Sequence, residues 1–204
     1  MSDDVDFRVL ELLCGRLCHE LVSPIGAINN GIELLDEDDP DFVKDAMALI
    51  AQSARKAGQR LQFYRFAYGT AGGSAAAVDG RELSAALLEG GKVRSEWAED
   101  AQSLAPPWQR LACNLVIVAA DILPRGGAVR VCGQGGGVEV AAEGDVVTLQ
   151  PEVKAALAGG IAADALTART VHAFYTMRLA GAIGAKLEVR EAPNRAGLTA
   201  LPGG

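Results

Sequence analysis

One histidine, His19, stands among residues that could carry out nucleophilic chemistry. The apolar residues around it recur at steps of three and four, which predicts a helix, and His19 falls on the side opposite the apolar stripe. The neutral imidazole of an exposed histidine has one ring nitrogen with a free lone pair, so it can attack and accept a phosphoryl group near neutral pH. We therefore expect His19 to be an exposed acceptor on a helix.

The residues next to His19 suit that chemistry. Glu20 is adjacent and could accept a hydrogen bond from the second ring nitrogen, which would fix the tautomer and stabilise the charge that develops on the ring. Small or polar residues follow at steps of four, three and four, and these are Ser23, Gly26 and Asn30. On a helix they form a strip along which another protein could approach the imidazole.

Pro24 belongs to the same segment and affects the backbone. It has no N–H to donate to the carbonyl of Glu20, so we expect the helix to bend just past the histidine and to present the ring. The alternative is that His19 is an ordinary surface histidine and Pro24 an ordinary kink.

Two long helices must position this segment. The apolar stripe of the first consists of Leu10, Leu13, Cys14, Leu17, Leu21, Ile25, Ile28, Ile32 and Leu35. A second helix begins near Pro40, which Asp39 caps, and ends near Tyr68. Its stripe consists of Val43, Ala46, Ile50, Ala54, Ala57, Leu61, Tyr64 and Tyr68. Because a single hairpin leaves much of both stripes in water, we expect two copies to pair into a four-helix bundle, which makes the chain a homodimer.

The pattern changes after a linker over residues 71–77. Asp79 with Glu82 begins a helix that stops at Gly90-Gly91, and Pro106 begins another that reaches about Leu123. A third helix is expected over 165–183. Expected strands are 92–97, 129–132, 138–142, 146–149, 187–190 and 198–201. These elements predict helices packed on a mostly antiparallel sheet.

Composition restricts the class of protein. The 204 residues carry a net charge of -7 with pI near 4.9, which argues against a nucleic-acid binder. No uninterrupted apolar run reaches about 18 residues and the amino terminus is acidic, so we expect neither a membrane span nor a signal peptide, and a cytoplasmic protein. The partners are expected to be proteins.

Other reactive side chains have structural interpretations. The four cysteines (Cys14, Cys18, Cys113 and Cys132) lie in apolar stretches and are expected to be buried reduced thiols, with neither a disulfide framework nor a zinc site. His172 is expected to be packed within an apolar helix rather than to be a second acceptor. The glycine run 133–137 lacks Gly-Lys-Ser/Thr and is expected to be a hairpin turn.

The His19, Glu20, Leu21 and Pro24 pattern resembles the phospho-acceptor box of sensor histidine kinases. The stretch 114–119 followed by 126–129 looks like the helix and turn of the kinase ATP-binding domain, and 172–189 with 197–199 is similar to its closing helix and hairpin. The resemblance implies the kinase fold over nearly the whole chain.

Three departures from that pattern argue against kinase activity. The asparagine that holds magnesium in active kinases would fall at Val118, whose side chain has no oxygen ligand. The adenine-pocket motif Asp-x-Gly-x-Gly is replaced by the residues 144–148, and no Gly-x-Gly lid surrounds 159–161. The resemblance therefore implies no ATP binding.

The run from Cys18 to Leu35, CHELVSPIGAINNGIELL, is similar to the signature of the ChpT-type histidine phosphotransferases of alphaproteobacteria. That likeness implies a phosphorelay carrier: a hybrid-kinase receiver donates its aspartyl phosphate to His19, which passes it to downstream regulators of the cell cycle. Magnesium would come from the receiver, and the chain would need no cofactor. By likeness to kinase hairpins, the receiver would dock on Ser23, Gly26, Ala27, Asn30, Gly31 and Leu34, with Gln52, Arg55 and Lys56 opposite.

We thus expect an α+β protein. Residues 1–70 would form an antiparallel helical hairpin for dimerisation and phosphotransfer, 71–77 a linker, and 78–204 a degenerate ATPase-like α/β sandwich resembling a histidine-kinase ATP-binding domain. Two alternatives remain open: an active histidine kinase, which ATP binding would reveal, and a non-catalytic module that only docks receivers.

Overall fold

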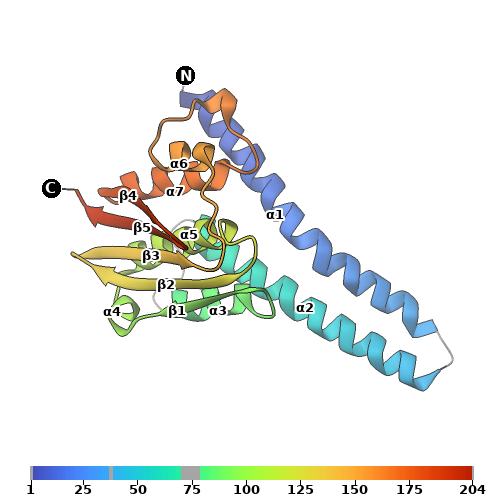
Figure 1. The fold of residues 1–204 in the computed structure, drawn as a ribbon. Helices are drawn as coiled ribbons and strands as arrows, with labels where there is room; N and C mark the ends of the chain where they lie inside the picture. The colour runs from blue at the N-terminus through green and yellow to red at the C-terminus, as the bar shows by residue number, and fades with distance from the viewer. Residues whose placement is uncertain (1, 37–38, 70–78, 204) are drawn as a thin grey trace.

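The fold begins with a long antiparallel helical hairpin, seen in a computed structural model that describes residues 2–36, 39–69 and 79–203 (Figure 1). Helix α1 (Ser2–Glu33) continues through Pro24 and ends in a short 3-10 turn, η1 (Leu34–Asp36). Helix α2 (Pro40–Tyr68) has the predicted bounds. The predicted cap is confirmed, since the Asp39 side chain accepts a hydrogen bond from the Asp41 N–H at 2.9 Å. The predicted linker, 71–77, lies outside the described residues.

The two helices pack closely at Gly31. A Cβ built there would lie 2.6 Å from Ile50 Cγ1 and 3.3 Å from the Ala46 carbonyl oxygen, so a side chain at this position would push the helices apart. Gly31 was predicted to contact the receiver, but it is buried against α2, so this part of the docking prediction does not fit the structure. Its small size permits close helix packing instead.

The apolar stripes are wider than one hairpin can bury. Leu13 and Ala46 are buried, but Ile25 and Ile32 are 47% and 53% exposed. Cys14 and Cys18 are exposed as well, so the prediction that all four cysteines are buried is wrong for these two; Cys113 is buried and Cys132 is half-buried.

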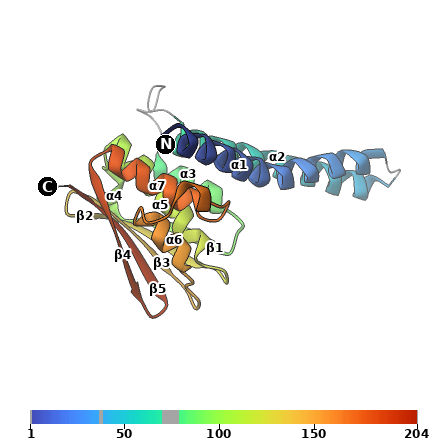
Figure 2. The same cartoon turned by 90° about the horizontal axis from the view of Figure 1, so that it is seen from above.

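The C-terminal region is a mixed sheet covered by helices on one face, which confirms the predicted α+β class (Figure 2). The strands run in the spatial order β1-β2-β3-β5-β4, with only the β1–β2 pair parallel. The elements are α3 (Gly80–Leu88), β1 (Val93–Trp97), α4 (Glu99–Gln102), α5 (Pro106–Asp121), β2 (Gly127–Gln134), β3 (Gly137–Glu143), α6 (Pro151–Leu157), η3 (Ala163–Ala165), α7 (Val171–Ala182), β4 (Ala185–Ala192) and β5 (Arg195–Pro202).

The core of this region lies between α5 and the sheet. Nine consecutive residues of α5, Leu111–Ala119, are buried, because one side of the helix packs on the sheet and the other faces α3, α7 and the hairpin. The predicted glycine turn joins β2 to β3: Gly135 and Gly136 have φ of 54° and 80°, as a two-residue hairpin turn requires.

Two predicted elements differ from the structure. The segment 146–149 is not a strand; the Thr148 N–H donates to the Ile122 carbonyl at 2.9 Å, and Val147 packs on the core beside the helices. Helix α7 begins at Val171 rather than near 165, because side-chain hydrogen bonds between Thr167 and Thr170 form a turn there. Short helices α4 and α6 were not predicted.

Hydrogen bonds attach the end of α2 to the C-terminal region. The Ala67 carbonyl, in the last turn of α2, accepts from Arg110 Nε at 3.1 Å, Asn114 Nδ2 at 3.0 Å and Tyr175 Oη at 3.3 Å. Carbonyls in the last turn of a helix lack helical donors, and here side chains of α5 and α7 supply them. The hairpin is thus held at one end, and Figure 1 shows its other end projecting away from the sheet.

Candidate active site

His19 lies near the middle of α1 and is exposed, as the sequence predicts. Among the described residues no side chain or backbone group forms a hydrogen bond or ion pair with its ring. An imidazole without partners keeps a free lone pair on one nitrogen and can be reached from solvent. The ring can therefore act as a nucleophile towards a group brought by another molecule.

Glu20 does not bond the His19 ring in this structure. Its carboxylate instead forms an ion pair with Arg60 Nη1 across the hairpin, on α2. The same Arg60 nitrogen donates to the backbone carbonyl of Glu20 at 2.9 Å. In an uninterrupted helix the N–H four residues later would donate to this carbonyl, but that residue is Pro24. The predicted hydrogen bond between Glu20 and the ring is therefore not made in this structure, where Arg60 takes the carboxylate.

Arg60 is a site residue that sequence reasoning missed. It lies forty positions from Glu20 in the sequence, so no local spacing connects the two. The available signal was the unpaired carbonyl that Pro24 creates, which needs a donor from another element. Nothing in the sequence alone identifies which donor supplies it.

The predicted docking residues mostly gather on one face of the hairpin beyond His19. Ser23 and Asn30 are exposed, and a Cβ at Gly26 would meet no atom within 4 Å, so a partner could approach the backbone closely. The other predicted contacts apart from Gly31 are also accessible: Leu34, Gln52, Arg55 and Lys56 are exposed and Ala27 is half-buried. This set without Gly31 is called the docking strip below.

The docking strip continues the side of α1 that meets the C-terminal region. Arg16 precedes Ser23 by seven residues, which places both on nearly the same side of the helix. Arg16 Nη2 donates to both carboxylate oxygens of Asp121 at the end of α5, at 2.8 and 3.1 Å. Burial disfavours the charge of Arg16, but Asp121, Tyr64 and Tyr68 together outweigh that effect, and the pKa of the guanidinium is raised. A partner on the strip would thus lie beside the C-terminal region.

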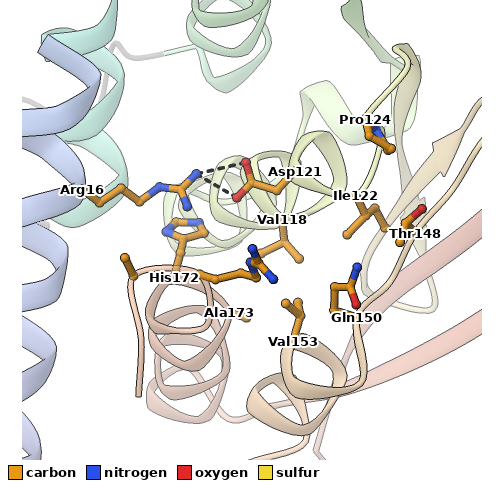
Figure 3. Close-up of a pocket in the computed structure, with 12 residues that line it drawn as sticks. Arg16, Val118, Asp121, Ile122, Pro124, Thr148, Gln150, Val153, His172 and Ala173 are labelled. Carbon is orange, nitrogen blue, oxygen red and sulfur yellow. Dashed lines mark hydrogen bonds and ion pairs between the residues drawn. The ribbon is translucent and has the colours of Figure 1, made fainter. Parts of the chain in front are cut away.

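A cavity of about 620 Å³ lies next to this ion pair (Figure 3). It is bordered by Arg16 and Asp121 at its edge and by Val118, Ile122 and Val153 from α5, the following turn and α6. Figure 3 shows the Val118 side chain among the residues that line the cavity. By the sequence resemblance, Val118 stands where active kinases would have a magnesium-binding asparagine. Val118 offers a metal ion no oxygen atom.

The second histidine has a different environment. His172 is 1% exposed; its Nε2 lies 3.1 Å from the Asn114 carbonyl and its Nδ1 lies 3.0 Å from Tyr68 Oη. Since a carbonyl only accepts, Nε2 carries the proton and Nδ1 accepts from the tyrosine hydroxyl. Burial, with a smaller contribution from the charge of Arg16, lowers the pKa of His172 to about 3. The prediction of a packed histidine is confirmed.

Over the described ranges, no group of three or more His, Cys, Asp or Glu side chains could hold a metal ion. In the same part of the chain, none of the helices combines the length and the apolar character needed to cross a membrane.

Comparisons with known proteins identify the family of the chain. The family described as "Histidine phosphotransferase C-terminal domain" matches residues 78–195. The chain is 34% identical over 200 residues to the protein phosphotransferase ChpT of Brucella abortus (strain 2308), which covers 93% of this chain and 94% of that protein. A solved bacterial phosphotransferase has a TM-score of 0.78 and 32% identity, covering 94% of this chain and 95% of the other.

Proposed function

The chain belongs to the histidine phosphotransferase family, and from this premise we propose that it accepts a phosphoryl group on His19 from the receiver aspartate of a hybrid kinase and passes it to receiver domains of response regulators. The observation that carries the assignment to His19 is its exposed ring, which no other described residue bonds, at the head of the docking strip. His172 is the chain's other histidine, and both of its ring nitrogens are engaged in the core.

The chemistry is an in-line transfer between two proteins. The lone pair of a His19 nitrogen forms the N–P bond while the bond from phosphorus to the aspartyl oxygen breaks, and that bonding pair leaves with the aspartate carboxylate. The reverse reaction, with a second receiver, passes the group on. Magnesium belongs to the receiver's acidic pocket, and this chain uses neither ATP nor a metal of its own. Its contribution is to hold the ring where the receiver can reach it.

A homodimer is the second part of the proposal. Large apolar side chains are exposed on the side of the hairpin opposite the docking strip: Phe7, Leu10, Ile25, Ile32, Met47 and Leu61. Exposed apolar area of this extent is typical of an interface, and a second hairpin would cover it as a four-helix bundle. This arrangement leaves both copies of His19 accessible.

The dimer can be tested by light scattering. We expect wild type to have twice the chain mass, and Ile32→Glu to shift it towards the monomer because a carboxylate would be buried in the bundle. Asn30→Glu, two residues away on the docking strip, is the matched control and should remain dimeric. A monomeric wild type would contradict the proposal.

The transfer is tested with a receiver domain that carries radiolabelled aspartyl phosphate. We expect label on the wild-type chain, none on His19→Ala, and none on either when labelled ATP is supplied alone. Label from ATP would establish a kinase instead. A wild-type chain that binds the receiver without taking label would establish a docking module.

A further inference from the structure

One backbone carbonyl next to His19 lacks its helical hydrogen bond, and a side chain of α2 supplies the missing donor. Pro24 leaves the Glu20 carbonyl without its helical donor, and an unpaired carbonyl in a packed hairpin weakens the helix next to the histidine. Arg60 Nη1 donates to this oxygen at 2.9 Å from α2. The bond comes from the facing helix, so it ties the first turn after His19 to α2.

The same guanidinium also binds the Glu20 side chain. Their side chains are 31% and 28% exposed, so the pair is partly shielded from solvent and from salt. The Glu20 carboxylate is therefore turned towards α2 and its charge is balanced. A free carboxylate beside His19 would instead repel the anionic phosphoryl group that a receiver brings to the ring.

Resting on the proposed function of His19, we propose that Arg60 is a positioning residue of phosphoryl transfer: it replaces the hydrogen bond that Pro24 removes and holds the Glu20 carboxylate away from the path of the phosphoryl group. Both effects act through Glu20 and its backbone, since the hydrogen bonds of Arg60 within the described residues all go to Glu20. Glu20 then works as part of this support rather than as the base of the reaction.

The role predicts a specific kinetic signature. Arg60→Met should lower the maximal single-turnover rate of label transfer from receiver to His19 by about tenfold, equivalent to roughly 1.4 kcal/mol of barrier. The receiver concentration for half-maximal rate should change less than about twofold, because Arg60 lies outside the docking strip. A residue that only stabilised the hairpin would leave the rate per folded molecule unchanged. Folding of each variant is checked by circular dichroism and thermal unfolding.

Arg65 provides the matched control. It lies on the same helix, is exposed, and its side chain has no hydrogen-bond partner among the described residues. Arg65→Met should therefore transfer at the wild-type rate. Arg60→Lys, which keeps a charged donor, should retain more of the rate than Arg60→Gln, which keeps donors without the charge.

Two further substitutions, each added to Arg60→Met, test the two bonds of Arg60 separately. Pro24→Ala restores an N–H to the Glu20 carbonyl, and Glu20→Gln removes the charge that Arg60 balances. Each double variant should transfer label about threefold faster than Arg60→Met alone and so recover part of the lost rate. Recovery by one or both supports the proposal, and recovery by neither overturns it. An Arg60→Met rate equal to wild type also overturns it, whereas absence of label on wild type would refute the function of His19 itself.

Discussion

The two histidines of this chain lie in opposite surroundings. His19 is exposed on α1 and none of the described residues bonds its ring, while His172 is buried with both nitrogens bonded and a pKa lowered to about 3. A buried neutral ring with a committed lone pair cannot attack a phosphoryl group, even though its residue type is the same. The comparison shows that two residues of the same type differ in exposure and hydrogen bonding, and these make His19 the candidate acceptor.

The surroundings also divide the hairpin into two parts. The end near His172 is bonded to α5 and α7 through Tyr68 and the Ala67 carbonyl. The part beyond His19 carries small or exposed side chains and, within the described residues, has few bonds to the C-terminal region. One part fixes the hairpin, and the other remains free for a partner.

The largest expected effect is at His19, where a substitution should remove activity and leave stability almost unchanged. His19→Ala should abolish phosphoryl acceptance, a loss of at least roughly a thousandfold, while the free energy of unfolding changes by less than about 0.5 kcal/mol because the side chain is exposed. Urea unfolding and label transfer on the same sample measure both quantities. A strongly destabilised variant would show that His19 has structural contacts after all.

The reverse result is expected at His172. His172→Leu keeps the volume but leaves the buried Tyr68 hydroxyl without its acceptor, which should lower the free energy of unfolding by about 2–3 kcal/mol. Transfer per folded molecule should stay within about twofold of wild type, as urea unfolding and initial rates can show. Loss of label acceptance in the folded variant would make His172 part of the chemistry.

The two rings should also differ in how they couple stability to pH. The pKa of His172 is lowered from 6.5 to about 3 by burial, so below pH 6.5 the unfolded chain takes up a proton that the folded chain does not. This contribution to stability is complete above pH 6.5 and declines as the pH falls towards 3. Between pH 7.5 and 5.5 the loss should be about 1.4 kcal/mol.

Urea unfolding at the two pH values measures this effect, with His172→Leu as the reference that lacks the titrating ring. Wild type should lose more stability than the variant over this interval. Equal losses would mean that the folded protein can protonate His172.

The smallest expected effect is at Gly26, in the part of the hairpin beyond His19. A methyl group there meets no atom within 4 Å, so Gly26→Ala should stabilise α1 by about 0.5–1 kcal/mol. The added methyl on the docking strip should raise the half-saturating receiver concentration about threefold. Gly181→Ala, an equally open helical position on α7, is the control for which only stability should change. An unchanged half-saturating concentration for Gly26→Ala would remove this residue from the docking strip.

Local signals predicted much of the fold. The Asp39 cap and Pro40 gave the start of α2, and Asp79 gave the start of α3, because caps and prolines act within a few residues. The prediction of a strand over 146–149 was wrong because alternating apolar residues can also pack a loop on a core. Only tertiary contacts decide between a strand and such a loop.

Fewer features of the candidate site than of the fold could be predicted from the sequence. Exposure of His19 follows from helical phase, which sequence contains. The burial of Gly31 and the partner of Glu20 depend on how α1 and α2 face each other, and that requires the rotation and register of two helices. Cys14 and Cys18 were placed with the buried thiols because a hairpin stripe wider than its interface looks the same in sequence as one that is covered.

The triple hydrogen bond on the Ala67 carbonyl has a consequence for local opening. The last turn of α2 cannot fray without releasing donors from α5 and α7, so its backbone amides should exchange with deuterium only when the C-terminal region itself opens. Helix ends elsewhere usually exchange first. Here the carboxyl end of the helix should be its slowest-exchanging part, so that protection rises along α2 towards the C-terminal region.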